Sequence, residues 1–440
     1  MAPELALVMI VASLVLIVVL STKLKLNMGL LAFVFTFAIG YWVCGLSSTD
    51  IAGFFPAKIA VTYILATCFF GYVKRAGVLT GISDRILWLF RKRPTLIPYA
   101  VFIASYIVTG LGAGAFATPA IMSPISFALA DALGYSPVLA AFAIACATGA
   151  GSMFPWMPET IVIKMYAPIV MNEGAADKAI LLFNLSITII YLVAFTVYYM
   201  IKKTYKLNRS VDLEKIIKKP EPYTPFQKKV LGVSIGFIIL AACPGILAAV
   251  APSAITAAIQ KNIDIYILFA FGIVILNAMK IEDVNVVIKE DIPWGALIMI
   301  CGTAMFFALV NPLGIVDLLA EWGSNLSAQY LVIPFLGVVG AGMSFFVNGM
   351  VAVQSLVPIV QALGAVFPGL SLMGMFVALE CGTGSTAISP FSTGGAMSLI
   401  GAPSNSVREK AIRGLMVCAA INVVILLALS LLGFFNWMTY

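Results

Sequence analysis

The sequence predicts an all-α polytopic membrane protein, built from two inverted repeats of five spans, each with a re-entrant hairpin and a broken helix. Of the 440 residues, 62% are hydrophobic and only 10% are charged, whereas a soluble domain carries about 25% charged residues. The apolar runs are long enough to cross the ~30 Å hydrocarbon core of a bilayer. In addition, the second half of the chain repeats features of the first.

An internal repeat links the two halves. The apolar stretch 55–79 begins with Phe-Pro and the stretch 292–316 begins with Ile-Pro, and the two align without a gap at an offset of 237 residues. The sequence Gly-x-Gly-Ser at 149–152 recurs at 382–385, an offset of 233. A repeat with glycine-rich interruptions at matching places is the best sequence indication of a secondary transporter's binding site.

Ten apolar segments are expected to cross the membrane. The first follows an acidic residue, Glu4, and not the basic residues of a secretory signal, so we expect a retained helix with an external N-terminus. Two segments contain the Gly-x-Gly-Ser sequences and exceed the ~20 residues of one crossing, so each is expected to form two half-helices around an unwound centre. The expected spans are 5–21, 28–44, 59–80, 137–170, 179–201, 230–250, 264–279, 291–312, 370–401 and 411–435.

Two further apolar segments, 96–133 and 329–366, turn at their centres, at 110–114 and at Asn348 and Gly349. Each arm has about 15 residues, or ~22 Å of helix, which passes the midplane but does not reach the far side. We therefore expect re-entrant hairpins, with a pair of ordinary kinked helices as the alternative. Irregular backbone at this depth requires cover from protein or an aqueous cavity.

The basic residues predict the orientation. Loops assigned to the cytoplasm hold 22 of the 26 Lys and Arg residues, and external loops hold three, as the positive-inside rule requires. Five spans on each side of a cytoplasmic linker make the halves inverted, with both termini outside. The predicted domains are 1–201, the first repeat; 202–229, a basic cytoplasmic linker; and 230–440, the second repeat. Segments 81–93 and 315–324 are amphipathic and are expected to lie in the interface.

The net charge of +7 is thus a topology signal, so we expect contact with membrane lipid and no nucleic acid partner. The predicted location is the inner (plasma) membrane of a bacterium or archaeon. The chain has no His, and its seven Cys residues form no CxxC pair, so neither a metal cluster nor a disulfide framework is expected. We expect no cofactor, with a sodium ion as a candidate coupling ion.

The glycine-rich breaks form the candidate transport site. Glycine allows positive φ and exposes backbone carbonyls that suit a cation, while half-helix starts offer N–H groups and positive dipole ends to an anion. We expect such starts near Thr118, Ser152, Met350 and Ser389. The candidate substrate-binding residues are Thr118, Thr148, Ser152, Asn348, Gly349, Ser385, Thr386 and Ser389. The candidate cation-binding residues are Gly112, Gly114, Gly149, Gly151, Asn348, Glu380, Gly382, Thr383 and Gly384.

Three charged residues far from the ends of expected spans need an explanation: Glu159, Lys164 and Glu380. A charge at the bilayer centre costs about 2.5–3.5 kcal/mol on insertion scales, so such residues usually have a function. Glu380 immediately precedes the second break and is expected to bind sodium or carry a proton, unless it only faces an aqueous vestibule. For Lys164 we favour snorkelling to the outer surface.

Several short motifs resemble a known family. Residues 27–32 (NMGLLA), 52–56 (AGFFP), 112–114 (GAG) and 120–124 (AIMSP) are similar to the N-terminal half of MatC-type dicarboxylate carriers. That family belongs to the ion transporter superfamily, alongside the divalent anion/sodium symporters. The resemblance covers residues 5–155, and beyond it the similarity is one of layout and internal repeat. It implies a dicarboxylate substrate, a hairpin in each inverted repeat, a homodimer and an elevator movement of the transport domain.

The chain departs from the symporters at the hairpin tips. The symporters carry Ser-Asn-Thr at both tips, where Asn and Ser help to bind sodium and carboxylate. Counted back from the Pro-Ile pairs at 124–125 and 358–359, the corresponding residues here are Gly-Ala-Phe at 114–116 and Asn-Gly-Met at 348–350. Because this chain has only one Asn at the two tips, the resemblance does not imply that it has the symporters' carboxylate contacts or their sodium stoichiometry.

The sequence therefore predicts a secondary active transporter of small organic anions, above all dicarboxylates, coupled to sodium or protons. One alternative is a sodium/proton or inorganic-anion exchanger of the same superfamily, whose mark would be flux without any carboxylate. The other is an intramembrane enzyme, which the absence of His and of HExxH or GxSxG motifs disfavours.

Overall fold

A computed structural model of the chain describes residues 2–157, 160, 163, 166–167, 170–171, 175–206, 213–217, 219–251, 253, 255–256, 258–259, 263, 265–315, 318, 321, 329–346 and 349–438. All regular elements in these ranges are helices, which confirms the predicted all-α class. Five helical segments are long and apolar enough to cross a membrane: Pro3–Ser21, Ser48–Arg75, Pro94–Ala113, Ala176–Ile201 and Asn405–Leu431. The bent pair Val284–Glu290 and Trp294–Ala308 adds a sixth if it is one span. The chain is an integral membrane protein.

The helices of the first half follow the expected spans closely. They are α1 Pro3–Leu24, α2 Met28–Trp42, α3 Ser48–Gly53, α4 Ala57–Arg75, α5 Val78–Phe90, α6 Ile97–Val108, α7 Gly114–Leu133, α8 Pro137–Gly151 and α10 Ala175–Ile201. One boundary differs from the expected span 59–80. The chain leaves the helix after Arg75 because Gly77 adopts a left-handed conformation (φ 73°), and α5 begins there as a separate helix.

Most of the described helices in the second half follow the same order as those in the first. Its helices are α11 Pro225–Val250, α13 Ile265–Ala278, α14 Val284–Glu290, α15 Trp294–Ala308, α17 Val332–Phe346, α18 Gly349–Val366, α19 Leu372–Thr386, α20 Thr393–Ser398 and α21 Asn405–Leu431. Most of the amphipathic segment expected at 315–324 lies outside the described residues, as do residues 207–212 of the linker.

Side-chain caps mark several helix starts. Ser47 and Asp50 form a capping box at α3, and Thr224 and Gln227 form another at α11. At α2 the side chain of Asn27 accepts a hydrogen bond from a first-turn amide. These caps supply acceptors for N–H groups that a helix start leaves unpaired.

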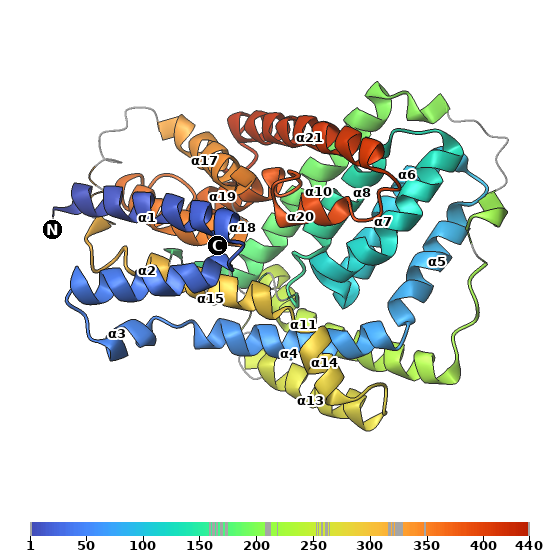
Figure 1. The fold of residues 1–440 in the computed structure, drawn as a ribbon, viewed down its shortest axis with the longest axis horizontal. Helices are drawn as coiled ribbons and strands as arrows, with labels where there is room; N and C mark the ends of the chain where they lie inside the picture. The colour runs from blue at the N-terminus through green and yellow to red at the C-terminus, as the bar shows by residue number, and fades with distance from the viewer. Residues whose placement is uncertain are drawn as a thin grey trace.

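Several helices of one half pack against helices of the other half, in two matching sets of pairs. α2 packs on α15, while α13 packs on α4; likewise α10 packs on α19, while α21 packs on α8. Within each half the pattern is also the same, since α8 packs on α6 and α7, and α19 packs on α17 and α18. In Figure 1, α6 and α7 lie towards the right of the view and α17 and α18 towards the left. The two halves are therefore interlocked, with their hairpin helices towards opposite ends of the molecule.

Glycines bring the backbones of paired helices into contact. A Cβ added to Gly302 of α15 would lie 2.1 Å from the carbonyl oxygen of Gly29 in α2. A Cβ on Gly382 of α19 would lie 2.1 Å from the carbonyl oxygen of Gly337 in α17. Small residues at such contacts allow close helix packing inside a membrane, where lipid supplies no hydrophobic drive for association.

Replacing Gly382 by Ala is expected to destabilise the protein, because the new methyl group would collide with the Gly337 carbonyl. Overpacking of this kind costs about 1–3 kcal/mol. Thermal unfolding of the purified protein in detergent measures the effect. Gly342→Ala is the matched control, since nothing lies within 4 Å of a Cβ added to Gly342 of α17. Equal unfolding temperatures for the two variants would contradict this view of the α17–α19 contact.

Candidate functional site

A cavity of about 140 Å³, here called the central cavity, lies beside the C-terminal ends of α8 and α19. Both halves line it, since α8 and the tip of the first hairpin meet α19 and the start of α18 there. α4 contributes Tyr63, α15 contributes Met299 and Ile300, and residues of α10 and α20 complete the lining. Seven of the predicted site residues line the cavity: Thr148, Gly149, Ser152, Gly349, Glu380, Thr383 and Gly384.

The break in the first half follows α8. Its last turn is held by side chains, because the Ser152 hydroxyl donates to the Thr148 carbonyl at 2.8 Å. From α10, the Asn184 amide donates to the Ala150 carbonyl at 2.9 Å. The Trp156 indole N–H donates to the Gly110 carbonyl of the first hairpin at 2.6 Å. The last carbonyls of α8 thus accept side-chain hydrogen bonds in addition to the backbone bonds from Ser152 and Met153.

The break in the second half follows α19 and has the same construction. The Asn422 amide of α21 donates to the Ser385 carbonyl at 3.0 Å, and the Tyr191 hydroxyl of α10 donates to the Gly384 carbonyl. Thr386 donates in the other direction, to the Ala341 carbonyl of α17 at 2.7 Å. These bonds fix the end of α19 to the second hairpin and to the last helix of each half.

The Gly-x-Gly pairs do not form the unwound centres that the sequence predicts. α8 continues through Gly149 and Gly151, and α19 continues through Gly382 and Gly384. The breaks come after them because these glycines serve close packing: a Cβ on Gly151 would lie 2.7 Å from the Tyr106 carbonyl oxygen of α6. Positive φ occurs instead at the first hairpin tip, at Gly112 (107°) and Gly114 (67°).

Two of the expected half-helix starts are also wrong. Ser152 caps the C-terminal end of α8 and begins no helix, and α20 begins at Thr393, after Ser389. In the first hairpin, α7 begins at Gly114 because a π-turn at Thr109–Ala113 reverses the chain before Thr118 is reached. α18 begins at Gly349, one residue before the predicted start at Met350.

Glu380 is the one charged side chain among the described residues that line the central cavity. It is 4% exposed, and one of its carboxylate oxygens has no hydrogen-bond partner. The hydroxyls of Thr148, Ser152 and Thr383 surround the same space and donate to helix carbonyls at 2.8 Å. Their oxygens remain available as acceptors, which gives the cavity a set of oxygen ligands suited to a small cation.

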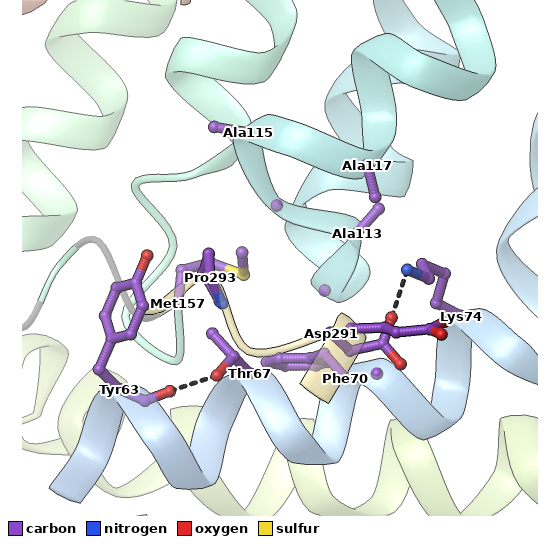
Figure 2. A pocket seen from close by; sticks show the side chains of 14 residues that line it. Tyr63, Thr67, Phe70, Lys74, Ala113, Ala115, Ala117, Met157, Asp291 and Pro293 are labelled. Carbon is purple, nitrogen blue, oxygen red and sulfur yellow. Dashed lines mark hydrogen bonds and ion pairs between the residues drawn. The ribbon is translucent and has the colours of Figure 1, made fainter. Parts of the chain in front are cut away.

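A second cavity of about 250 Å³, the outer cavity, lies between the first hairpin tip and α4 (Figure 2). Gly112 and Gly114 line it, together with Lys74 and Asp291. Tyr63 and Ala115 line both cavities, so the two adjoin.

An ion-pair network at the end of α4 borders the outer cavity. Asp291, whose side chain is 2% exposed, pairs with both Lys74 and Arg75. Arg75 also binds Glu290 at 2.7 Å and Glu282 at 3.2 Å. This network joins α4 to the bend between α14 and α15.

Other predicted site residues do not line the central cavity. Thr118 is buried and shares a 2.9 Å hydrogen bond with Thr109, and Ser389 donates to the Phe345 carbonyl at 3.3 Å. Ser385 and Thr386 are buried in the α19 contacts, as Gly151 and Gly382 are in their helix packing. Asn348, Glu159 and Lys164 lie outside the described residues.

Sequence reasoning missed Asn184 and Asn422. Each is a single amide inside a long apolar span, and the two are 238 residues apart, an offset within one residue of the 55–79 repeat. A polar side chain in such a span usually has a partner within the bundle. The match between the repeat offset and the two amides was the available signal.

Comparison with known proteins supports the transporter fold. Residues 1–152 match the family model of the dicarboxylate carrier protein MatC N-terminus. MtrF of Neisseria gonorrhoeae, described among a class of antimetabolite efflux pumps, superposes with a TM-score of 0.59 at 16% identity, covering 90% of this chain and 84% of that one. The YdaH transporter of Alcanivorax borkumensis superposes with a TM-score of 0.60 at 15% identity and 88% coverage of both chains. No curated protein sequence matches the chain. The chain thus shares its fold with these two transporters.

Replacing Asn422 by Leu is expected to destabilise the end of α19, because the Ser385 carbonyl would lose its donor in a buried site. An unsatisfied buried polar group costs about 1–3 kcal/mol. Thermal unfolding in detergent reports the loss. Ser430→Ala on the same helix is the control, since its hydroxyl donates only to the Leu426 carbonyl one turn earlier. An Asn422→Leu protein as stable as this control would refute the capping role.

Proposed function

We propose that the protein is a secondary active transporter of small organic anions, above all dicarboxylates, coupled to sodium or protons. The observation that carries this proposal is the central cavity, in which the ends of α8 and α19 meet around the buried carboxylate of Glu380. Its volume of about 140 Å³ is below the ~300–1,000 Å³ of pockets for drug-sized ligands. The match of the N-terminal third to a dicarboxylate carrier model supports the substrate class.

The packing supports two inverted repeats, 1–201 and 230–440, joined by a cytoplasmic linker. An inverted repeat places equivalent helices on opposite sides of a pseudo-two-fold axis, and the exchanged pairs α2–α15 with α4–α13, and α8–α21 with α10–α19, have this relation. In this arrangement α6–α7 and α17–α18 are the re-entrant hairpins.

The same packing suggests how the site alternates between the two sides. The hairpins, α8, α10, α19 and α21 pack mainly on one another, as do α1, α2 and α15, and α4 packs with α11 and α13. We propose that the first group moves as a transport domain past the second, in an elevator mechanism, and that the protein works as a homodimer.

The charge of Glu380 supplies a coupling mechanism. No Lys or Arg is among the described residues that line the central cavity, so an ionised Glu380 would repel an entering carboxylate. At an effective dielectric of ~20, two unit charges about 4 Å apart repel by about 4 kcal/mol. A sodium ion or a proton on Glu380 removes this repulsion, and anion and cation then favour each other's binding to the same extent.

The two ligands would use different parts of the cavity. Glu380 and the hydroxyl oxygens of Thr148, Ser152 and Thr383 would hold the cation. Among the described residues, no group of three or more His, Cys, Asp and Glu side chains is arranged for a metal, so these oxygens are the cation ligands we propose. Gly349 begins α18, whose first-turn N–H groups lack helical acceptors and would hold the anion. The Asn348 amide, one residue earlier in the chain, is a proposed substrate ligand.

Reconstitution tests the function directly. Proteoliposomes containing the purified protein should accumulate a labelled dicarboxylate when an inward sodium or proton gradient is imposed, and empty liposomes should not. The panel should include mono-, di- and tricarboxylates. Sodium or inorganic-anion flux without transport of any carboxylate would instead support an exchanger and contradict the proposal.

Glu380→Gln is expected to weaken the dependence of uptake on the coupling ion, because the amide carries no charge to neutralise. Uptake is measured against sodium concentration and against pH in both proteins. Thr383→Val is the companion variant, since it keeps the carboxylate and removes one proposed oxygen ligand. If the Glu380→Gln protein shows the same dependence of uptake on sodium and on pH as the unchanged protein, Glu380 has no role in coupling.

The orientation is tested at residue 208, in the part of the linker outside the described residues. In a background with Cys44 and Cys243 replaced by Ala, Asn208→Cys should resist an impermeant thiol reagent added to intact cells, and Lys178→Cys should react. Rapid labelling of Asn208→Cys from outside would show that the proposed orientation is wrong.

A further inference from the structure

We propose that the protein has a binding site for the headgroup of an anionic phospholipid at the C-terminal end of α10. A pocket of about 390 Å³ lies there, apart from the two cavities of the transport site. One wall is the segment after α10, with Lys202, Lys203 and Lys206. The other is the connection from α7 to α8, 133–136. The inference rests on this pocket and on the membrane location, and does not depend on which substrate is transported.

The pocket is built for negative charge. It has three lysines and no acidic residue among its lining side chains. Within the described part of the chain none of these lysines forms an ion pair, whereas Arg91, at the end of α5, is paired with Glu214 at 3.0 Å. Asp131, in the last turn of α7, is not part of the lining. Lys202 and Lys206 lie over the rings of Tyr198 and Tyr205, at 5.5 and 5.8 Å. Three ammonium groups without an acidic partner around one pocket can neutralise a phosphate and donate hydrogen bonds to its oxygens.

The lysines are held in place by the local fold. Lys203 has a left-handed backbone conformation (φ 50°), which ends α10 and turns the chain into a short helix at Thr204–Lys206. Thr204 is 3% exposed and anchors this turn, so the lysines on either side of it are directed outwards. On the opposite wall, Ser136 caps the start of α8, whose positive dipole end faces the same region.

The surface beside the pocket suits acyl chains. α10 is one of the helices long and apolar enough to span a membrane, and the lysines follow directly after its last residue. One side of α10 carries large exposed apolar side chains that continue to the lysines: Leu185, Leu192, Val193, Val197, Met200 and Ile201. A phospholipid with its headgroup in the pocket would therefore place its acyl chains along this stripe. A free phosphate in the same pocket would leave the apolar stripe uncovered. Basic pockets of this kind at the cytoplasmic surface bind anionic lipid headgroups.

Binding to the full-length purified protein in detergent tests the site. The probes are dioctanoyl phosphatidylglycerol, dioctanoyl phosphatidylcholine and inorganic phosphate, each titrated and followed by thermophoresis or native mass spectrometry. Phosphatidylglycerol should bind more tightly than the other two. Replacing Lys202, Lys203 and Lys206 together by Gln should weaken its binding at least about tenfold, because each of the three lysines attracts the anionic headgroup and all three charges are removed at once.

The matched control replaces Lys219, Lys228 and Lys229 by Gln, which removes the same charge from exposed positions in the linker and at the start of α11. It should change phosphatidylglycerol binding by less than about twofold. Replacing the three pocket lysines by Arg should preserve binding. An equal loss in both Gln variants, equal binding of the two lipids, or lysine-dependent binding of phosphate without binding of phosphatidylglycerol would each overturn the proposal.

Discussion

The structure depends on satisfying the backbone where helices stop inside the protein. A buried carbonyl without a donor costs several kcal/mol in hydrocarbon, which is why irregular backbone at membrane depth requires cover. α8 and α19 both end in the interior, and side chains from neighbouring helices donate to their last carbonyls. Asn184 and Asn422 do this from α10 and α21. These hydrogen bonds hold both helix ends in place beside the central cavity.

The carbonyl donors also connect the site to the rest of the molecule. Tyr191 of α10 reaches across to the Gly384 carbonyl of α19 in the other half of the chain. The central cavity in turn adjoins the outer cavity through Tyr63 and Ala115, and the outer cavity is bordered by the ion pairs of Asp291. A movement of the first hairpin against α4 would therefore change both cavities together.

Hydropathy, charge and turn residues predicted much of the fold. Helices occupy the expected spans because apolar length is decided locally, and the first hairpin turns at Gly112 and Gly114 because their positive φ favours glycine. The role of the other glycines was not predictable in this way. Gly382 marks a close contact with Gly337 of another helix, and a glycine needed for close packing has the same appearance in a sequence as one needed for a turn. Seven predicted residues meet in the central cavity, but Thr118 and Ser389 bind elsewhere because tertiary contacts direct their hydroxyls.

We propose that the anion binds in the central cavity, between the ends of α8 and α19. Substrate protection of a cysteine tests it most directly. Ala115 lines both cavities, whereas Ala117 lines only the outer one. In proteoliposomes of a protein with Cys44 and Cys243 replaced by Ala, a transported anion with its coupling ion should slow thiol labelling of Ala115→Cys and leave Ala117→Cys unchanged. Labelling of Ala115→Cys at the same rate with and without a transported anion would contradict the account.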